Sequence, residues 1–246
     1  MSSVKKFVIR LDDVGSDAES GECNLIRKLC DRGLALTCAV VPRWLTRRST
    51  RTLRQLAEHY PGAIEFHQHG WSHSNYAPPL ETENKHEFGG VRPRAEQESD
   101  ILQGRAILES SFAGFFTSVF TPPYGAFDDV TASILSDHGF AGISACPWSR
   151  EVPFLPDLTP HVDCCIWNPP GEKHSATIEA EWQMDPTRGI HGFILHPRWS
   201  STDATVENIC TLTESGQSSL FSSLLQRSDD DLCRKSQLQD DRPRTI

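Results

Sequence analysis

The chain has 246 residues, a formal net charge of −9 at pH 7 and a hydrophobic fraction of 37%. This length suits one substantial hydrophobic core or two small ones. The acidic balance argues against a general binder of nucleic acid or anionic membranes, and no apolar run approaches the roughly 20 residues that cross a bilayer. The first residues, MSSVKKFVIRLDD, do not read as a secretory signal, so we expect a cytoplasmic protein.

Two features of the composition have ordinary structural interpretations. The eight cysteines include no CxxC pair, which favours reduced thiols in the core over disulfides or a structural zinc site. The arginine-rich segment RWLTRRSTRTLR predicts a solvated helical face that buries Leu45, Leu53 and Leu56. A polyanion site is the alternative for this segment.

Apolar runs and helical periodicity alternate along the chain. Strands are predicted at 6–13, 35–42, 63–70, 118–121, 141–147, 161–170 and 189–199. Helices are predicted at 16–33, 43–59, 95–112, 128–140, 177–184, 205–216 and 218–227. Ser16 and Glu19 have the spacing of a capping box. The polar segment 74–93 is too long for a turn and indicates a functional loop.

This alternation predicts an α/β fold with a parallel sheet, either open or closed into a barrel. We expect one domain over residues 1–227 and a disordered polar tail over 228–246. The candidate functional residues all fall at the carboxyl ends of predicted strands, where such sheets build their sites: Asp12, Asp13, His69, Tyr124 and His196.

The residues HGWSH and LDDV carry the main chemical signal. His69 and His73 are four apart and can face one point. Asp12 and Asp13 directly follow an apolar strand, where unpartnered carboxylates are costly. One carboxylate with two histidines makes a three-ligand cation site with open positions, and leaves the second acid free to act as a base. Capping of the next helix is the alternative role for the acids.

Three further features are less specific. The rigid turn FTPPYG could direct a backbone N–H at a developing oxyanion, or be an ordinary turn. His196, in ILHPRW, follows the last apolar strand and could equally be a satisfied edge histidine. His67 shares a strand face with Glu65 and His69, and we favour a hydrogen-bonded supporting role over that of an extra ligand.

Four segments, taken in order, resemble the motifs of the polysaccharide deacetylases of carbohydrate esterase family four. These are RLDDV at 10–14, EFHQHGWSH at 65–73, TPPYG at 121–125 and ILH at 194–196. The order and spacing agree over about residues 5–200. The resemblance implies a distorted (β/α) barrel with about seven parallel strands.

The resemblance also implies roles for individual residues. Asp13, His69 and His73 would hold one divalent metal ion, zinc first, with cobalt, nickel, manganese or iron as alternatives. Asp12 would be the general base, the backbone N–H of Tyr124 would support the oxyanion, and His196 would protonate the leaving amine.

The sequence departs from the family pattern in three places. Thr121 stands where the third motif has an arginine that orients the base; Arg10 or Arg198 could substitute, or Asp12 could go without. The Asp and Trp of the fourth motif are not evident, and Asp163 and Trp148 are the candidates. Gly70 replaces the usual Thr or Ser. These changes suggest a divergent branch with its own substrate.

The loop NKHEFGGVRPR could define that substrate, or be a solvated loop. Charged side chains there could bind a phosphate, a carboxylate or sugar hydroxyls. The candidate substrate-binding residues are Lys85, Glu87, Arg92, Trp148 and Arg198.

Three hypotheses follow. The first is a metal-dependent hydrolase that removes an acyl group, acetyl foremost, from an amino-sugar amide in a glycan precursor, glycolipid or sugar-bearing metabolite. The second keeps the metal site but cleaves a non-sugar C–N bond in a ureide or cyclic imide. The third is a non-catalytic carbohydrate-binding homologue. We expect a small-molecule or glycan partner and no nucleic acid; the sequence leaves the oligomeric state open.

Overall fold

The structure is a computed structural model that describes residues 5–16, 21–78, 84–167, 169–184, 186, 189–200 and 202–226. The predicted tail at 228–246 lies wholly outside these residues. Of the predicted Ser16–Glu19 capping box, Ser16 is described and Glu19 is not. No helix in the described ranges is long and apolar enough to cross a membrane. Every cysteine in these ranges is a free thiol, as predicted.

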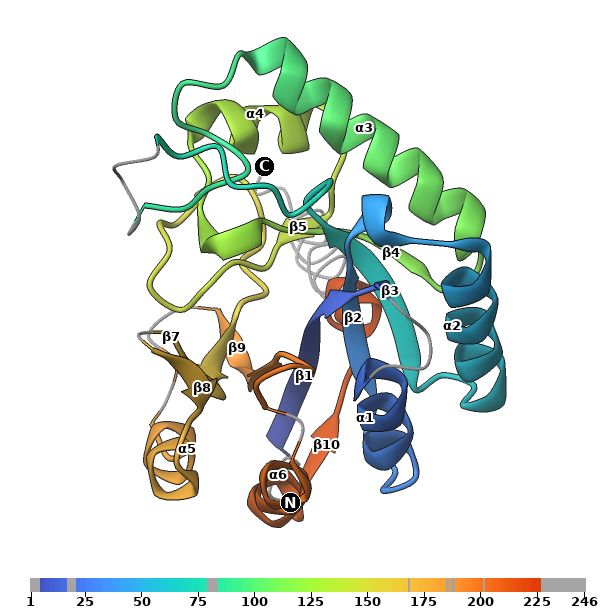
Figure 1. Ribbon diagram of the computed structural model, residues 1–246. Coiled ribbons are helices and arrows are strands. Elements are labelled where there is room, and N and C mark those ends of the chain that lie inside the picture. Colours follow the sequence, from blue (N-terminus) through green and yellow to red (C-terminus); the bar gives the residue numbers. More distant parts are fainter. Residues whose placement is uncertain are drawn as a thin grey trace, which may run out of the picture.

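One curled parallel sheet forms the centre of the molecule, with strands in the order β5-β4-β3-β2-β1-β9-β6 and β10 beside β1 (Figure 1). Its strands are β1 (Lys5–Val14), β2 (Leu36–Val40), β3 (Ile64–His69), β4 (Phe116–Thr121), β5 (Gly142–Ile143), β6 (Pro160–Asp163), β9 (Ile190–Leu195) and β10 (Gly216–Ser218). The seven strands of the main path form a half-barrel, which confirms the predicted distorted (β/α) barrel of about seven parallel strands.

Helices lie around the strands, with α3 and α4 at the top of Figure 1, α2 at the right and α5 and α6 below. The α-helices are α1 (Gly21–Cys30), α2 (Arg47–His59), α3 (Arg94–Ser111), α4 (Asp129–Asp137), α5 (Ser175–Trp182) and α6 (Asp203–Thr213). Two short 3₁₀ turns, η1 (Pro42–Trp44) and η2 (Pro123–Gly125), follow β2 and β4. Residues 221–226 are also helical.

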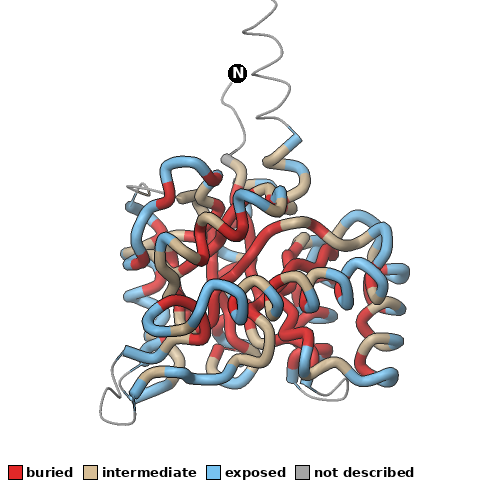
Figure 2. Tube along the Cα trace, turned by 90° about the horizontal axis from the view of Figure 1, so that it is seen from above, coloured by how far each residue is buried: buried red, intermediate tan, exposed pale blue. Residues whose placement is uncertain are grey.

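The main core lies between the sheet and its helices, and Figure 2 shows the buried stretches in the middle of the molecule. The residues of β2 and β3 are buried throughout, because a central parallel strand is covered on both faces. Most residues of β2 are apolar, whereas β3 buries Glu65 and His67 by hydrogen-bonding them. The α2 helix turns its arginines outward and buries Leu53 and Leu56, as predicted, while Leu45 is partly buried before the helix begins.

Two segments differ from the prediction. The single strand predicted over 161–170 is broken after β6, because the Asp163 carboxylate accepts the Cys165 N–H at 2.9 Å; the chain then forms a two-stranded antiparallel ribbon of β7 (Cys165–Trp167) and β8 (Pro170–Glu172). The helix predicted over 205–216 ends at Thr213, and residues 216–218 form β10. This strand pairs with the first residues of β1, whose backbone groups need partners there.

Glu65 is a buried carboxylate that fastens the chain's last described helical turns to the sheet. Its oxygens accept the Thr117 hydroxyl at 2.7 Å and the backbone N–H groups of Phe221 and Ser222 at 2.6 and 3.3 Å. A carboxylate at the start of a helix satisfies N–H groups that have no partner within the helix.

Replacing Glu65 by alanine should therefore lower the free energy of unfolding by about 2–4 kcal/mol, since it leaves several buried donors without an acceptor. The same change at the exposed Glu58 on α2 should alter it by less than about 0.5 kcal/mol. Denaturant unfolding of the two variants measures the difference, and equal stabilities would refute a fastening role for Glu65.

Candidate active site

The candidate residues gather at one edge of the sheet because all its strands run parallel and end together. Asp12 and Asp13 lie near the end of β1, and His69 and Thr121 are the last residues of the neighbouring strands β3 and β4. Asp163 ends β6, and His196 follows β9 directly. Residues far apart in the sequence therefore meet at one place.

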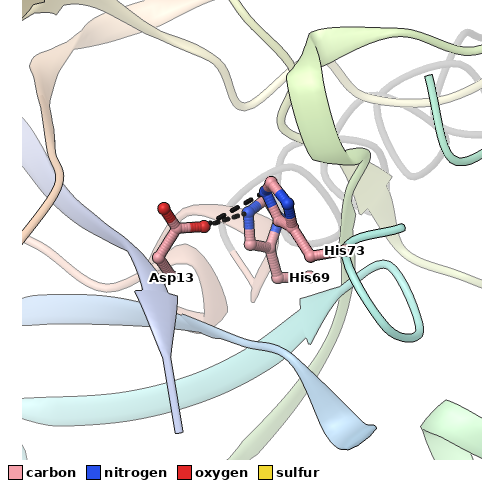
Figure 3. A group of neighbouring side chains, drawn as sticks. All are labelled: Asp13, His69 and His73. Atoms are coloured by element: carbon pink, nitrogen blue, oxygen red, sulfur yellow. Dashed lines mark hydrogen bonds and ion pairs between the residues drawn. The ribbon is translucent and has the colours of Figure 1, made fainter. Parts of the chain in front are cut away.

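Asp13, His69 and His73 form a compact set of three donors (Figure 3). The Asp13 Oδ1 atom lies 3.2 Å from the Nε2 atoms of both His69 and His73. Oxygen and nitrogen donors around a tetrahedral zinc ion are about 3.4 Å apart for the usual bond lengths. The side chains therefore have the types and separations that a divalent cation requires.

The hydrogen bonds around His69 also fit a cation. Its Nδ1 lies 3.0 Å from the Thr121 carbonyl, which can only accept, so the Nδ1 atom carries a proton. Without a cation the Nε2 N–H donates to Asp13, so a cation that displaces this second proton meets a lone pair on the atom that faces Asp13. Burial alone would raise the pKa of Asp13, but hydrogen bonds from His69 and His73 outweigh it and hold that pKa well below its usual range. The carboxylate is thus ionised and ready to bind.

The backbone is strained where the chemistry lies. Among the described residues, three that are not glycine have a positive φ, namely Asp13 (58°), His73 (58°) and Tyr124 (61°). The left-handed region is costly for residues with a Cβ, and such outliers cluster at functional sites. All three residues belong to the predicted site. Their backbone strain is evidence for a function at this edge that does not depend on the sequence motifs.

Glu87 holds the turn that carries His73. Its carboxylate is buried and accepts the N–H groups of Trp71 and Ser72 at 3.1 and 2.7 Å and the Ser72 hydroxyl at 2.8 Å. The same carboxylate explains Gly70, where a Cβ would come within 2.1 Å of Glu87 Oε2 and 2.4 Å of Pro123. The turn therefore has glycine in place of Thr or Ser because Glu87 occupies that space.

Asp12 is paired with Arg10 in the interior of the half-barrel. The guanidinium donates to both carboxylate oxygens at 2.8 Å, and both side chains are almost fully buried. Arg10, one of the two arginines that the sequence allowed for this role, is therefore the one that binds Asp12. Arg198 does not bind it, because it is exposed and its guanidinium lies over the Trp199 ring at 4.7 Å.

His196 faces the same carboxylate from the end of the neighbouring strand β9. Its Nε2 lies 3.6 Å from Asp12 Oδ2, and its ring packs edge-on against Trp167 with the centroids 4.6 Å apart. The Trp167 indole N–H donates to Asp163 at 2.9 Å. Asp163 and Trp167 therefore support His196. The prediction of Trp148 for this position is wrong: that side chain is 63% exposed, because it lies in a surface loop after β5.

Tyr124 lies beside the metal-type donors. Its ring packs against His73 at 4.6 Å between centroids, and its hydroxyl donates to the His73 carbonyl at 2.9 Å. Within the described part of the chain the Tyr124 N–H has no hydrogen-bond acceptor, whereas the next N–H, of Gly125, bonds to the Pro122 carbonyl. The left-handed turn thus leaves one backbone donor free for a ligand.

His67 is a buried supporting residue, as favoured from the sequence. Its two ring nitrogens bond to the hydroxyls of Thr37 and Thr121, each at 2.9 Å. Burial and the nearby Arg10 hold the pKa of His67 well below its usual value, so the ring is neutral. The Thr121 hydroxyl therefore bonds to His67 in the interior, while the Thr121 carbonyl accepts a hydrogen bond from the His69 ring.

The loop residues proposed to bind substrate separate into two groups. Glu87 and Arg92 are engaged internally, which corrects their assignment. Arg92 donates to the Glu87 carbonyl at 2.8 Å and to Asp100 at 2.7 Å, and lies 4.2 Å from the Tyr76 ring centre. Lys85 and Arg198 are exposed.

Sequence reasoning missed three residues around His196. Trp167, four positions after Asp163, went unrecognised because Trp148 was the candidate for this position. Cys165 lies with its Sγ 3.7 Å from His196 Nδ1, and Ser200 Oγ accepts the His196 N–H at 2.8 Å. The cysteine and serine carry no spacing signal, because loop geometry alone brings them to the histidine.

The fold and the site together define an α/β half-barrel protein with a cation-type donor set beside a buried carboxylate and a histidine at one sheet edge. The sequence profile of the polysaccharide deacetylase family matches residues 4–143, which is more than half of the chain. The chain belongs to this family. No curated protein matches it.

Several solved structures share the fold. A pseudoenzyme of carbohydrate esterase family 4 from Bacillus anthracis is 17% identical, with a TM-score of 0.62 over 92% of this chain and 66% of that one. A peptidoglycan deacetylase from Bacillus subtilis is 19% identical, with a TM-score of 0.59 over 98% of both chains. A family 4 acetyl xylan esterase from Clostridium thermocellum, in complex with cobalt, is 16% identical, with a TM-score of 0.61 over 90% and 91%.

The role of Glu87 leads to a prediction about metal affinity. Glu87→Gln keeps the size of the side chain but replaces one acceptor oxygen by a donor, so the turn that carries His73 should loosen. We expect the dissociation constant for a divalent cation to rise about 10–100-fold, as for other groups that orient ligands. Calorimetric titration of the metal-free protein measures this.

Glu96→Gln, on the exposed first turn of α3, is the matched control and should change the dissociation constant by less than about twofold. Equal affinities in the two variants would show that the turn does not depend on Glu87.

Proposed function

We propose that the protein is a metal-dependent hydrolase that removes an acyl group, foremost acetyl, from the amide of an amino sugar. One observation carries this proposal: a three-donor set of Asp13, His69 and His73 adjoins Asp12, a second carboxylate that Arg10 pairs with and that His196 faces at 3.6 Å. Hydrolysis of an amide needs an electrophilic centre, a base for water and an acid for the amine. The three-donor set would hold a cation that supplies the first, and Asp12 and His196 supply the base and the acid.

Asp13 Oδ1, His69 Nε2 and His73 Nε2 are the atoms that would hold the cation, with zinc as our first choice for this donor set. A bound divalent cation supplies Lewis acidity, which polarises the acyl carbonyl and makes water a better nucleophile. The Thr121 carbonyl keeps the His69 ring in the orientation that binding requires.

Asp12 serves as the general base. Burial alone would raise its pKa, but Arg10, His69 and His196 outweigh this and keep the pKa below its usual value. The carboxylate is therefore ionised at neutral pH and can accept a proton as water adds to the acyl carbon. Because Arg10 binds both carboxylate oxygens, it fixes the direction from which the proton is accepted.

His196 serves as the general acid, and the Tyr124 N–H supports the oxyanion. When the C–N bond breaks, His196 Nε2 donates its proton to the departing nitrogen, so the products are a carboxylic acid and an amine. Trp167 packs against this imidazole and restricts its rotation. The free Tyr124 N–H can donate to the carbonyl oxygen as negative charge develops on it.

The Arg10 pairing also bears on the alternative of a non-catalytic homologue. The strongest sequence argument for lost catalysis is Thr121, which replaces the arginine of the third motif. Since Arg10 binds the base from within β1, that replacement no longer implies a misplaced base. The pseudoenzyme among the similar structures shows the fold alone, so activity has to be measured on this chain.

Trp167 favours a sugar over a small ureide or imide as substrate. It packs against His196 and is 41% exposed, so part of an aromatic surface adjoins the candidate acid. Aromatic faces suit the apolar faces of sugar rings. Amine release from N-acetylated amino sugars and from ureides and cyclic imides, compared under the same conditions, separates the two substrate classes. The cytoplasmic location stays a prediction.

The central test separates the metal from the base. Asp13→Ala should lose tight cation binding and turnover together. Asp12→Asn should retain the cation, measured by elemental analysis after dialysis, while kcat falls by about 10²–10⁴-fold. A metal-free wild-type protein, or an Asp13→Ala variant with full turnover, would refute the proposed mechanism.

A second test concerns Arg10. Arg10→Lys keeps a positive charge but loses the two parallel hydrogen bonds to Asp12, so the base should be misdirected and kcat should fall about 10²-fold with little change in cation affinity. Arg198→Lys is the matched control, because Arg198 is the other arginine that the sequence allowed for this role. A loss of turnover in Arg198→Lys alone would overturn the assignment.

A further inference from the structure

His196 belongs to a second group of side chains that could bind a metal, on the side of its ring that faces Cys165 rather than Asp12. Asp163, Cys165 and His196 each offer one donor atom, these atoms lie within 4.8 Å of one another, and all three residues are buried. They come from the end of β6, the start of β7 and the residue after β9. The group shares no residue with the set formed by Asp13, His69 and His73.

The geometry suits a cation that prefers sulfur and nitrogen. The Cys165 Sγ atom lies 3.7 Å from His196 Nδ1. For usual zinc–sulfur and zinc–nitrogen bond lengths, the two donors of a tetrahedral site are about 3.5 Å apart. This is the length of a hydrogen bond between a thiol and an imidazole, and it is also close to the distance between two ligands of one ion.

The three donors are also held in place by other groups. Asp163 Oδ2 accepts the Trp167 indole N–H at 2.9 Å and Oδ1 accepts the Cys165 N–H at 2.9 Å. Ser200 Oγ accepts the His196 N–H at 2.8 Å. Ligands of protein metal sites have such outer hydrogen bonds, which fix their orientation before a metal arrives.

We propose that Asp163, Cys165 and His196 form a second site, selective for soft divalent cations such as zinc or cadmium, whose occupation inhibits the enzyme by binding His196 through Nδ1. The inhibition rests on the proposed function, in which His196 donates a proton from Nε2. A cation on Nδ1 occupies the lone pair that would otherwise accept the second proton of the ring, so His196 cannot carry a proton to give to the amine. The acid is then lost although the first site is intact.

The thiol supplies the selectivity. Burial raises the pKa of Cys165 to about 12, so the thiol is protonated in the free protein. Binding of the cation replaces that proton, which passes to solvent, and forms a metal–sulfur bond without oxidation or reduction. Zinc and cadmium bind thiolate strongly enough for this exchange, whereas manganese and magnesium favour oxygen ligands. The latter ions should occupy only the first site.

Cobalt provides a direct probe, because only the second site contains sulfur. Metal-free full-length protein titrated with Co²⁺ should show d–d absorption from the first equivalent and a thiolate-to-cobalt charge-transfer band only as a second equivalent binds. Cys165→Ser should abolish the charge-transfer band and keep the first-equivalent absorption, which also shows that the variant is folded. Cys146→Ser and Cys210→Ser change partly exposed cysteines and should keep the band.

Enzyme activity provides the second measurement. The rate at several equivalents of Zn²⁺, divided by the rate of the same protein at one equivalent, should fall at least about tenfold in the wild type and stay near one in Cys165→Ser. Excess Mn²⁺ should leave the wild-type ratio near one. Absence of the charge-transfer band in the wild type, or its persistence in Cys165→Ser, overturns the second site. If the protein has no activity, the proposed function fails while the cobalt spectra still decide the site.

Discussion

The buried pair of Arg10 and Asp12 is the interaction on which the site most depends. Arg10 is 1% exposed, and a guanidinium in such a place must have its charge and its N–H groups matched. Asp12 supplies the charge, and the carbonyls of Ser144 and Ala145 accept from the same nitrogen at 2.8 and 2.6 Å. Because Ser144 follows β5, the edge strand of the path, Arg10 spans the inside of the half-barrel. Arg10 therefore connects the segment after β5 to Asp12 on β1, so the shape of the half-barrel and the charge pairing of Asp12 depend on the same side chain.

Much of this arrangement follows from the sequence. Strands buried on both faces appear as short apolar runs, and the polar residues at their ends are brought together whenever the strands are parallel. His69 and His73 could therefore be placed near the Asp12–Asp13 pair without a structure, and the family resemblance selected Asp13 as their partner. Residues held by long-range side-chain contacts could not be placed in this way. Glu87 and Arg92 appeared as charges in a polar loop, yet both are enclosed by the turn they support.

At two of the departures from the family motifs, a second residue makes a contact that the residue at the motif position does not make. Thr121 lacks the guanidinium expected at its position, and Arg10 provides one from β1, while the Thr121 hydroxyl bonds to His67 instead. Gly70 lacks a side chain, and the Glu87 carboxylate fills the space and binds the following N–H groups. In the first case a residue distant in sequence supplies a guanidinium to Asp12, and in the second a distant residue fills the space beside the glycine. A single motif position, judged alone, does not show such contacts.

His196 then has two chemically different neighbours, which is the least expected feature of the site. Its Nε2 faces the carboxylate of Asp12, while its Nδ1 faces the thiol of Cys165 rather than a carboxylate. The thiol carries no negative charge on the Nδ1 side of the ring, unlike the Asp12 carboxylate on the Nε2 side. The same thiol, with Asp163 close by, offers a soft cation two further donors. The residue that the proposed function uses as the acid is therefore also a ligand of the proposed second site, and the Cys165 sulfur atom is what distinguishes the two sides of its ring.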